Sequence, residues 1–157
     1  EFASLIKRII EDVGIAPAEL ELEVTESVVQ TDPRNLSIFQ DLKNLGISLA
    51  IDDFGTGYSS FASLKHLKVD CLKIDKYFVD DMLVDNQALI LIRSMIEMGH
   101  KLGYGIIAEG VEKSEQLDIL SSLGCEKIQG YLFSKPANAN TISKLLVPRQ
   151  RKLDKTV

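Results

Sequence analysis

The chain has 157 residues, a net charge of −5 and an apolar fraction of 45%, values typical of one globular domain or part of one. The acidic balance argues against a broad basic face for DNA or RNA. Cys71 and Cys125 lack the spacing of a zinc site, so we expect both to be reduced core residues. No apolar run reaches the ~18 residues that span a bilayer. We therefore expect a cytoplasmic domain, and a membrane anchor elsewhere in a longer parent protein stays open.

Helical and strand patterns alternate along the chain. Apolar residues at spacings of three and four predict helices, and strict alternation or short apolar runs predict strands. Glycine follows several helices, for example at Gly46, whose helix has Asp32 as its expected N-cap. The predicted elements in chain order are a helix at 1–13, a strand at 20–24, a helix at 33–45, a strand at 47–51, a short helix at 60–66, a strand at 71–75, a helix at 86–102, a strand at 105–109, a helix at 114–123, a strand at 127–129 and a helix at 140–146.

Repeated β-α units with short connections imply a parallel sheet. Active sites of (β/α)8 barrels are built at the C-terminal ends of the strands, whereas those of open doubly wound sheets gather at one crevice. Five strands with polar ends favour the barrel, but a complete barrel has ~250 residues. We therefore expect an α/β fold, an incomplete (β/α)8 TIM-type barrel with about five C-terminal β-α units over residues 1–147, and a basic, disordered tail at 148–157. The polar strand-end residues are Glu23, Asp52, Lys73, Glu109 and Gln129.

Two adjacent carboxylates, Asp52 and Asp53, follow the apolar run at 47–51. Neighbouring side chains of a strand point to opposite sides, so both reach one point only if the chain bends, which Gly55 makes easy. Crowded carboxylates repel unless a cation lies between them, and Mg²⁺ and Mn²⁺ prefer such oxygen ligands. The alternative is that one aspartate caps the next helix.

Glu23 and Lys73 are the next candidates. Glu23 shares one strand face with Glu21, opposite the leucines and valine. A metal at the barrel mouth is one partner for Glu23, and an ion pair with Lys73 is the other; for Glu21 we favour a structural role. Lys73 lies between two apolar residues and points away from both, so it orients a water molecule, offsets negative charge or forms a structural ion pair.

The remaining carboxylates lie in or near turns. Glu26 caps a helix or holds the Asp52 loop, and we prefer the second role to direct metal binding. Glu109 is a ligand candidate. Glu112 binds water or begins a helix, and the helix start is the better interpretation when it is taken alone.

Gln129 ends the last predicted strand and can hydrogen-bond a metal-bound water or a substrate oxygen. Tyr131 and Phe133 can stack on a base, although aromatic residues at such positions are more often core. His66 and His100 lie on predicted helices without a partner at ligand spacing, and we interpret both as structural.

Five segments, taken together, closely resemble the EAL-domain family of bacterial phosphodiesterases, which hydrolyse cyclic di-GMP. They occur in the family's order and spacing across nearly the whole chain, and the resemblance implies a modified (β/α)8 barrel. The segments are Glu-Val-Thr-Glu-Ser (23–27), Asp-Asp-Phe-Gly-Thr-Gly-Tyr-Ser-Ser (52–60), Val-Asp-Cys-Leu-Lys-Ile-Asp (69–75), Ala-Glu-Gly-Val-Glu (108–112) and Gln-Gly-Tyr-Leu-Phe-Ser-Lys-Pro (129–136).

The resemblance implies a site for Mg²⁺ or Mn²⁺ that Ca²⁺ inhibits. Glu23 and Asp52 would ligate the metal, with Asp52 shared by two ions. Asp53 would serve the second ion, and Glu109 would be another ligand. Lys73 would hold the attacking water, and the product would be the linear dinucleotide.

The resemblance also implies how the substrate and a partner are held. Glu112, Gln129 and Pro136 would act on cyclic di-GMP directly or through waters. Glu26 would anchor the loop at 54–60, which the family links to substrate and metal binding and to homodimer contacts. An upstream sensory or GGDEF-type domain is expected in the parent protein.

Two family features are absent from the sequence: the Glu-Ala-Leu signature, whose glutamate is a metal ligand, and an asparagine ligand of the next motif. Lys68 also stands where the family often has proline. We therefore expect the C-terminal portion of an active parent, a portion that is inactive alone. The alternatives are a non-catalytic EAL-like module that binds a nucleotide or a protein, and a barrel hydrolase for another phosphodiester.

Overall fold

The computed structural model describes residues 1–25, 27–28, 34–56 and 68–146. The expected cap at Asp32, helix at 60–66 and tail at 148–157 lie outside them. The strands are β1 (Glu21–Thr25), β2 (Ser48–Phe54), β3 (Cys71–Ile74), β4 (Gly105–Ala108) and β5 (Lys127–Ile128). The helices are α1 (Phe2–Val13), the 3-10 turn η1 (Pro17–Glu19), α3 (Arg34–Asn44), α5 (Lys76–Asp81), α6 (Asn86–Leu102), α7 (Ser114–Ser122) and α8 (Ala139–Leu146).

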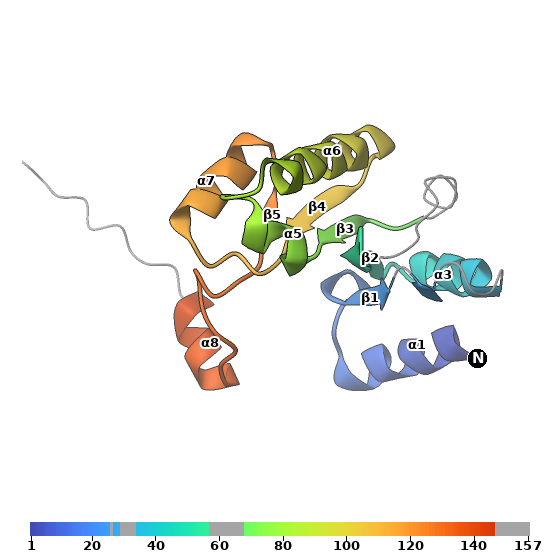
Figure 1. Ribbon diagram of the computed structural model, residues 1–157. Helices are drawn as coiled ribbons and strands as arrows, with labels where there is room; N and C mark the ends of the chain where they lie inside the picture. Colours follow the sequence, from blue (N-terminus) through green and yellow to red (C-terminus); the bar gives the residue numbers. More distant parts are fainter. Residues whose placement is uncertain (26, 29–33, 57–67, 147–157) are drawn as a thin grey trace, which may run out of the picture.

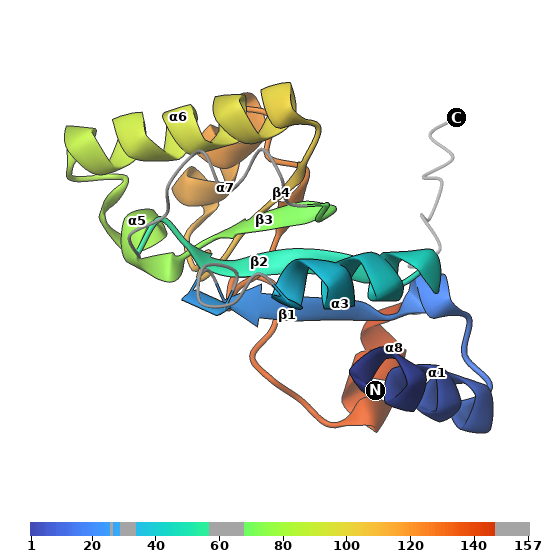
Figure 2. The same cartoon turned by 90° about the vertical axis from the view of Figure 1, so that its right-hand side faces the viewer.

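The described strands form one sheet in the order β1-β2-β3-β4-β5, and every neighbouring pair is parallel. A doubly wound sheet reverses its strand order at a switch point, whereas a barrel continues in one direction. Figure 1 shows α6 and α7 along the same side of β3, β4 and β5, and Figure 2 shows α3 alongside β2. The sheet confirms the predicted α/β fold and its order is that of a barrel.

Alternate strand residues divide the apolar core into two faces. Ile51 and Leu72 belong to the large cluster that packs under the helices, whereas Ala50, Cys71 and Ile107 form a small separate cluster. Side chains of a strand alternate with a period of two. Residues two positions beyond the small cluster therefore lie on its face, which is the inner face of a barrel.

Helix ends follow local chemistry. The boundaries of α6 agree with the predicted 86–102, and Gly103 ends it with a left-handed φ of 85°. The short helix α5 was not predicted, because six residues hold too little periodicity. Its N-cap is Asp75, whose carboxylate accepts the Tyr77 N–H at 2.8 Å.

No helix among the described residues is long and apolar enough to cross a membrane.

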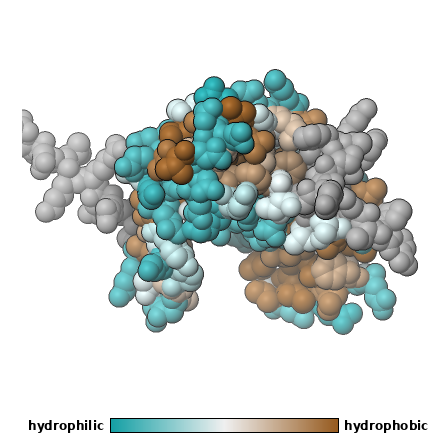
Figure 3. Space-filling view, viewed as in Figure 1, coloured by the Kyte–Doolittle hydropathy of each residue, from teal (hydrophilic) through white to brown (hydrophobic). Residues whose placement is uncertain are grey.

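The helix expected at 1–13 is present as α1, but most of its apolar stripe is exposed. Ile10 is the buried residue of α1. Phe2, Leu5, Ile9 and Val13 are 49, 50, 48 and 66% exposed, and Figure 3 shows apolar surface gathered over α1. The helix packs on α3 beside the edge strand β1, so only one side of its stripe meets the core.

Both cysteines are free and buried, which confirms the expected reduced core thiols. Burial raises the pKa of the Cys125 thiol to about 11 and also raises the pKa of Cys71. Because the thiolate is the reactive form, we expect neither thiol to react with Ellman's reagent at pH 8 in the folded chain. Both should react after unfolding in urea, and a thiol that reacts within minutes before unfolding would contradict this expectation.

Candidate functional site

Lys73 lies at the centre of three carboxylates at the carboxyl end of the sheet. Its Nζ is 2.6 Å from Glu23 Oε1, 2.9 Å from Asp52 Oδ1 and 2.7 Å from Glu109 Oε1. The Lys73 side chain is 4% exposed, whereas that of Glu23 is 47% exposed. The ion pair that the sequence left open for Glu23 is therefore present, and two more carboxylates share it.

The strand register explains why these groups converge. Lys73 in β3 lies opposite Ile107 in β4, so Glu109 follows two residues later on the same face. Asp52 lies two residues after Ala50, again on the inner face. Residues that are distant in sequence thus meet because parallel strands present their ends at one edge.

Electrostatics fix the charge state of Lys73. Burial lowers its pKa, but hydrogen bonds to the three carboxylates, Glu109 foremost, outweigh burial and hold the pKa well above the usual range. The ammonium therefore stays protonated at neutral pH and cannot act as a general base. It offsets the negative charge of the three carboxylates, which engage its three N–H donors, and it can donate to water or to a phosphate oxygen only where one carboxylate releases it.

Asp53, the neighbour of Asp52, has a backbone conformation that is uncommon for a residue other than glycine. It takes a left-handed φ of 55°, where β2 and β3 shift register. The bend expected at Gly55 therefore begins earlier, at Asp53 itself. The exposed Asp53 carboxyl lies within hydrogen-bonding reach of Asp75, and desolvation followed by the charge of Asp52 raises its pKa.

The donor atoms of the cluster are of the type that binds the predicted divalent metal. Its groups offer carboxylate oxygens, which Mg²⁺ and Mn²⁺ prefer. Within residues 1–25, 27–28, 34–56 and 68–146, however, no group of three or more His, Cys, Asp or Glu side chains is arranged to hold a metal ion. The ammonium contacts account for one oxygen of each carboxylate, so the donor types fit such an ion while Lys73 takes the central place.

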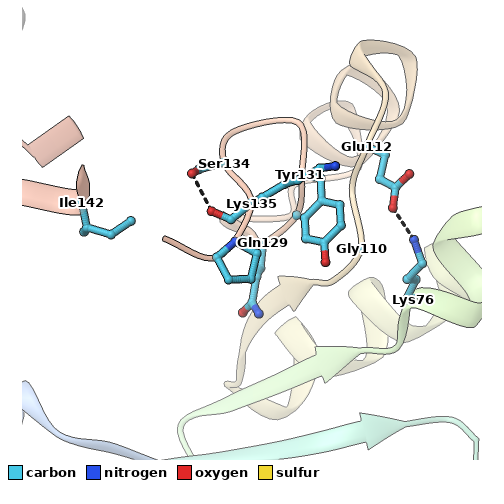
Figure 4. A pocket seen from close by; sticks show the side chains of 10 residues that line it. Lys76, Gly110, Glu112, Gln129, Tyr131, Ser134, Lys135 and Ile142 are labelled. Carbon is cyan, nitrogen blue, oxygen red and sulfur yellow. Dashed lines mark hydrogen bonds and ion pairs between the residues drawn. The ribbon is translucent and has the colours of Figure 1, made fainter. Parts of the chain in front are cut away.

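A second feature of the site is a cavity of about 520 Å³, which is lined by Gly110, the residue that follows Glu109. It lies between α5, the loop after β4 and the segment after β5. In Figure 4 the ion pair of Lys76 and Glu112 stands on one side, and Gln129 and Tyr131 stand on another. The lining residues are Lys76, Gly110, Glu112, Gln129, Gly130, Tyr131, Ser134, Lys135, Pro136 and Ile142.

Charged and aromatic groups share this cavity. Lys76 Nζ is 2.6 Å from Glu112 Oε1, and this pairing lowers the pKa of Glu112 and raises that of Lys76. Lys135 Nζ lies 5.6 Å from the Tyr131 ring centroid, a cation–π contact. The core interpretation of Tyr131 and Phe133 was wrong, because they are 54 and 61% exposed. Lys76 and Lys135 were not predicted as site residues, although Lys76 directly follows the motif at 69–75 and Lys135 lies within the motif at 129–136.

Three further residues were considered in the sequence, and the structure describes one of them, His100. Glu26, the expected loop anchor, and His66 are outside the described residues. His100 Nε2 is 2.7 Å from Glu126 Oε1, in agreement with its structural interpretation. The site residues thus divide into the Lys73 cluster, the neighbouring Asp53 and the cavity of Glu112, Gln129 and Pro136.

Known proteins are similar to this chain in sequence and in fold. Residues 1–136 match the EAL domain family. The cyclic di-GMP phosphodiesterase NbdA of Pseudomonas aeruginosa is 39% identical over 142 residues, which are 90% of this chain and 18% of NbdA. The structure of the PaMucR phosphodiesterase with cyclic di-GMP has a TM-score of 0.83 and 36% identity over 87% of this chain and 56% of that one. Klebsiella pneumoniae BlrP1 with manganese and cyclic di-GMP has a TM-score of 0.80 and 32% identity over 85 and 34%.

The coverage is unequal on the two sides of each match. This chain spans about a fifth of the length of the curated relatives that it matches, whereas the family match covers residues 1–136, nearly all of the chain. BlrP1 has also been solved with calcium and cyclic di-GMP. Because the family match extends over most of the residues, it confirms the resemblance drawn from the five motifs. The chain belongs to the EAL domain family.

Proposed function

We propose that this chain carries active-site residues of a cyclic di-GMP phosphodiesterase, which opens one phosphodiester bond to give the linear dinucleotide. The observation that carries the proposal is the convergence of Glu23, Asp52 and Glu109 on one buried ammonium, that of Lys73. Relatives named for this activity or solved with cyclic di-GMP support the substrate class.

Each residue of the cluster has a proposed task. Lys73 would hold the attacking water with an N–H donor that one of the three carboxylates releases when it binds the metal. Mg²⁺ or Mn²⁺, when bound, supplies a more acidic water and stabilises the leaving oxygen; Ca²⁺ would compete for the same oxygens and inhibit. The proposed ligands are Glu23, Asp52, Asp53 and Glu109.

The cavity would hold the dinucleotide. Glu112, Gln129 and Pro136 line it, and their polar atoms would meet the substrate directly or through waters. Glu26 would anchor the loop at 54–60. We also propose a homodimer that uses this loop and nearby helices, and a sensory or GGDEF-type domain upstream in a longer protein.

One observation favours a second candidate function. Lys73 satisfies the three carboxylates without a metal, and the described part of the chain holds no preformed metal group. A non-catalytic EAL-like module that binds the nucleotide or a protein partner would suit such a cluster. The two functions differ in whether the bound dinucleotide is cleaved.

Hydrolysis assays separate the candidates. The chain would be incubated with Mn²⁺ and, in turn, cyclic di-GMP, cyclic di-AMP and a simple aryl phosphodiester, and products resolved by chromatography. Of the three substrates, we expect only cyclic di-GMP to be cleaved, and its product to be the linear dinucleotide. We expect the rate to be on the order of 100-fold below that of a complete barrel, because the five strands supply only part of the metal-binding groups. Faster cleavage of another substrate, or binding without cleavage by a complete barrel, would contradict the phosphodiesterase proposal.

A further inference from the structure

Gln116 is a buried polar side chain that the proposed chemistry does not use. It lies in the first turn of α7 and is 2% exposed. Its Oε1 accepts the N–H groups of Glu112 and Lys113, each at 2.9 Å, and its Nε2 donates to the Val79 carbonyl oxygen at 2.9 Å. A buried donor or acceptor left without a partner costs about 1–3 kcal/mol, so the amide is held in one orientation.

The partners of Gln116 belong to two parts of the site. Val79 lies in α5, the helix that follows β3 and therefore Lys73. Glu112 lies in the loop between β4 and α7, which begins with Glu109. Through one side chain, Gln116 thus ties the loop of two proposed site carboxylates to the helix that follows the central lysine.

A helix cap explains only one of the three bonds. In a capping box the third helical residue accepts the N–H of the N-cap, and Lys113 is the N-cap of α7. The bond from Glu112 comes from a residue before the helix, and the bond to Val79 reaches 37 positions along the chain. The bond from Glu112, the bond to Val79 and the burial of the side chain together make Gln116 a bridge between α5 and the loop before α7.

The bridge and an ion pair act on the same wall of the cavity. Lys76 of α5 holds the Glu112 carboxylate at 2.6 Å, but this pair is half exposed and such pairs are weak. We infer that Gln116 is a positioning residue, which sets the spacing between α5 and the loop and so places Lys76 and Glu112 to receive the dinucleotide. The effect on ligand binding rests on the proposed function.

Gln116→Glu is the most selective change. It keeps the acceptor for the two N–H groups and replaces the donor by an oxygen that faces the Val79 carbonyl. At pH 7.5 an ionised carboxylate repels that carbonyl, whereas at pH 5 a protonated carboxyl again donates to it, because burial disfavours the charged form. Gln87→Glu, the same change at an exposed glutamine of α6, is the matched control.

Two measurements report on the bridge. By calorimetry with Ca²⁺ present, we expect Gln116→Glu to bind cyclic di-GMP on the order of tenfold more weakly than the unmodified chain at pH 7.5, or ~1.4 kcal/mol, and nearly equally at pH 5. Gln87→Glu should match the unmodified chain at both. By amide hydrogen exchange, the amides of α5, which the bond from Gln116 to Val79 no longer holds, should lose protection in Gln116→Glu at pH 7.5 alone.

The outcomes separate the inference from the function. Unchanged affinity and unchanged exchange of the α5 amides at pH 7.5, or an equal loss at both pH values, would overturn the role of Gln116. No binding by the unmodified chain would instead refute the dinucleotide site, and the exchange of the α5 amides would then decide the inference. If Gln116→Glu is unfolded at pH 7.5, the neutral Gln116→Asn, shorter by one methylene, should show the same loss with no recovery at pH 5.

Discussion

Lys73→Met is expected to lower the free energy of unfolding by about 3 kcal/mol at pH 7.5 in metal-free buffer. The change removes an ammonium that is 4% exposed and leaves Glu23, Asp52 and Glu109 facing one another. Removing one partner of a buried ion pair costs ~3–5 kcal/mol, and the lower end applies because Glu23 is 47% exposed. Urea unfolding followed by circular dichroism measures the difference.

The pH dependence of this loss has a definite sign. The folded-state pKa of Lys73 is raised, so its contribution is fully present below the unfolded pKa of ~10.4 and is lost only as the pH rises through the folded value. The difference between Lys73→Met and the unmodified chain should therefore be constant from about pH 6 to pH 9. A difference that already shrinks across this range would contradict the charge assignment.

Lys76→Met is the matched control. Lys76 also pairs with two carboxylates, at 2.6 Å from Glu112 and 3.2 Å from Asp80, but all three side chains are about half exposed. We expect a loss below ~1 kcal/mol. Millimolar Mn²⁺ should restore part of the stability of Lys73→Met, because a cation again lies among the carboxylates, and should stabilise Lys73→Met by more than it stabilises Lys76→Met. Equal losses in the two variants would show that the Lys73 cluster is not special.

Gly130→Ala is expected to cost about 3 kcal/mol, the upper end of overpacking. A Cβ at Gly130 would overlap the backbone oxygen and nitrogen of Val111 and lie 2.7 Å from its carbonyl carbon. The Val111 backbone cannot give way, because its N–H donates to the Gln129 oxygen at 3.1 Å and its oxygen accepts the Leu132 N–H at 3.0 Å. Thermal unfolding should show a markedly lower midpoint.

Gly103→Ala separates crowding from backbone preference. Gly103 has a left-handed φ of 85°, yet a Cβ there would meet nothing within 4 Å, so we expect a cost of ~1 kcal/mol. Gly130→Ala should also abolish dinucleotide binding, because Gln129 and Tyr131 flank it in the cavity. If both alanine variants unfold at the same midpoint and bind alike, the close approach of Gly130 to Val111 does not hold in solution.

The periodicity of apolar residues in the sequence predicted most of the helices and strands and the residues at the centre of the site. The alternation around Lys73 and the abrupt end of the apolar run at Asp52 were enough to predict that both lie at the carboxyl ends of strands, and the observed register then places them on one face. The helix at 86–102 was equally readable from its length and its glycine stop. These features depend on neighbours in sequence, which is why the sequence alone reveals them.

Features that depend on distant partners could not be predicted. The left-handed backbone of Asp53 coincides with the shift in register between β2 and β3, and residues other than glycine adopt this backbone uncommonly. In the sequence Gln116 is an ordinary residue near a helix start, and its bond to Val79 exists only because the fold places the two residues side by side. The exposure of Tyr131 likewise depends on what packs above it. Each of these is decided by tertiary contacts that no local pattern encodes.

Calorimetric titration of cyclic di-GMP into the chain, with Ca²⁺ in place of Mg²⁺ to block turnover, tests the central claim most directly. We expect saturable binding of one dinucleotide per chain that requires Ca²⁺ and is lost in Asp52→Asn. That result would place the dinucleotide and the cation at the carboxylates around Lys73. Absence of binding by a chain that circular dichroism shows to be folded, or equal binding by Asp52→Asn, would contradict the claim that these residues form the site.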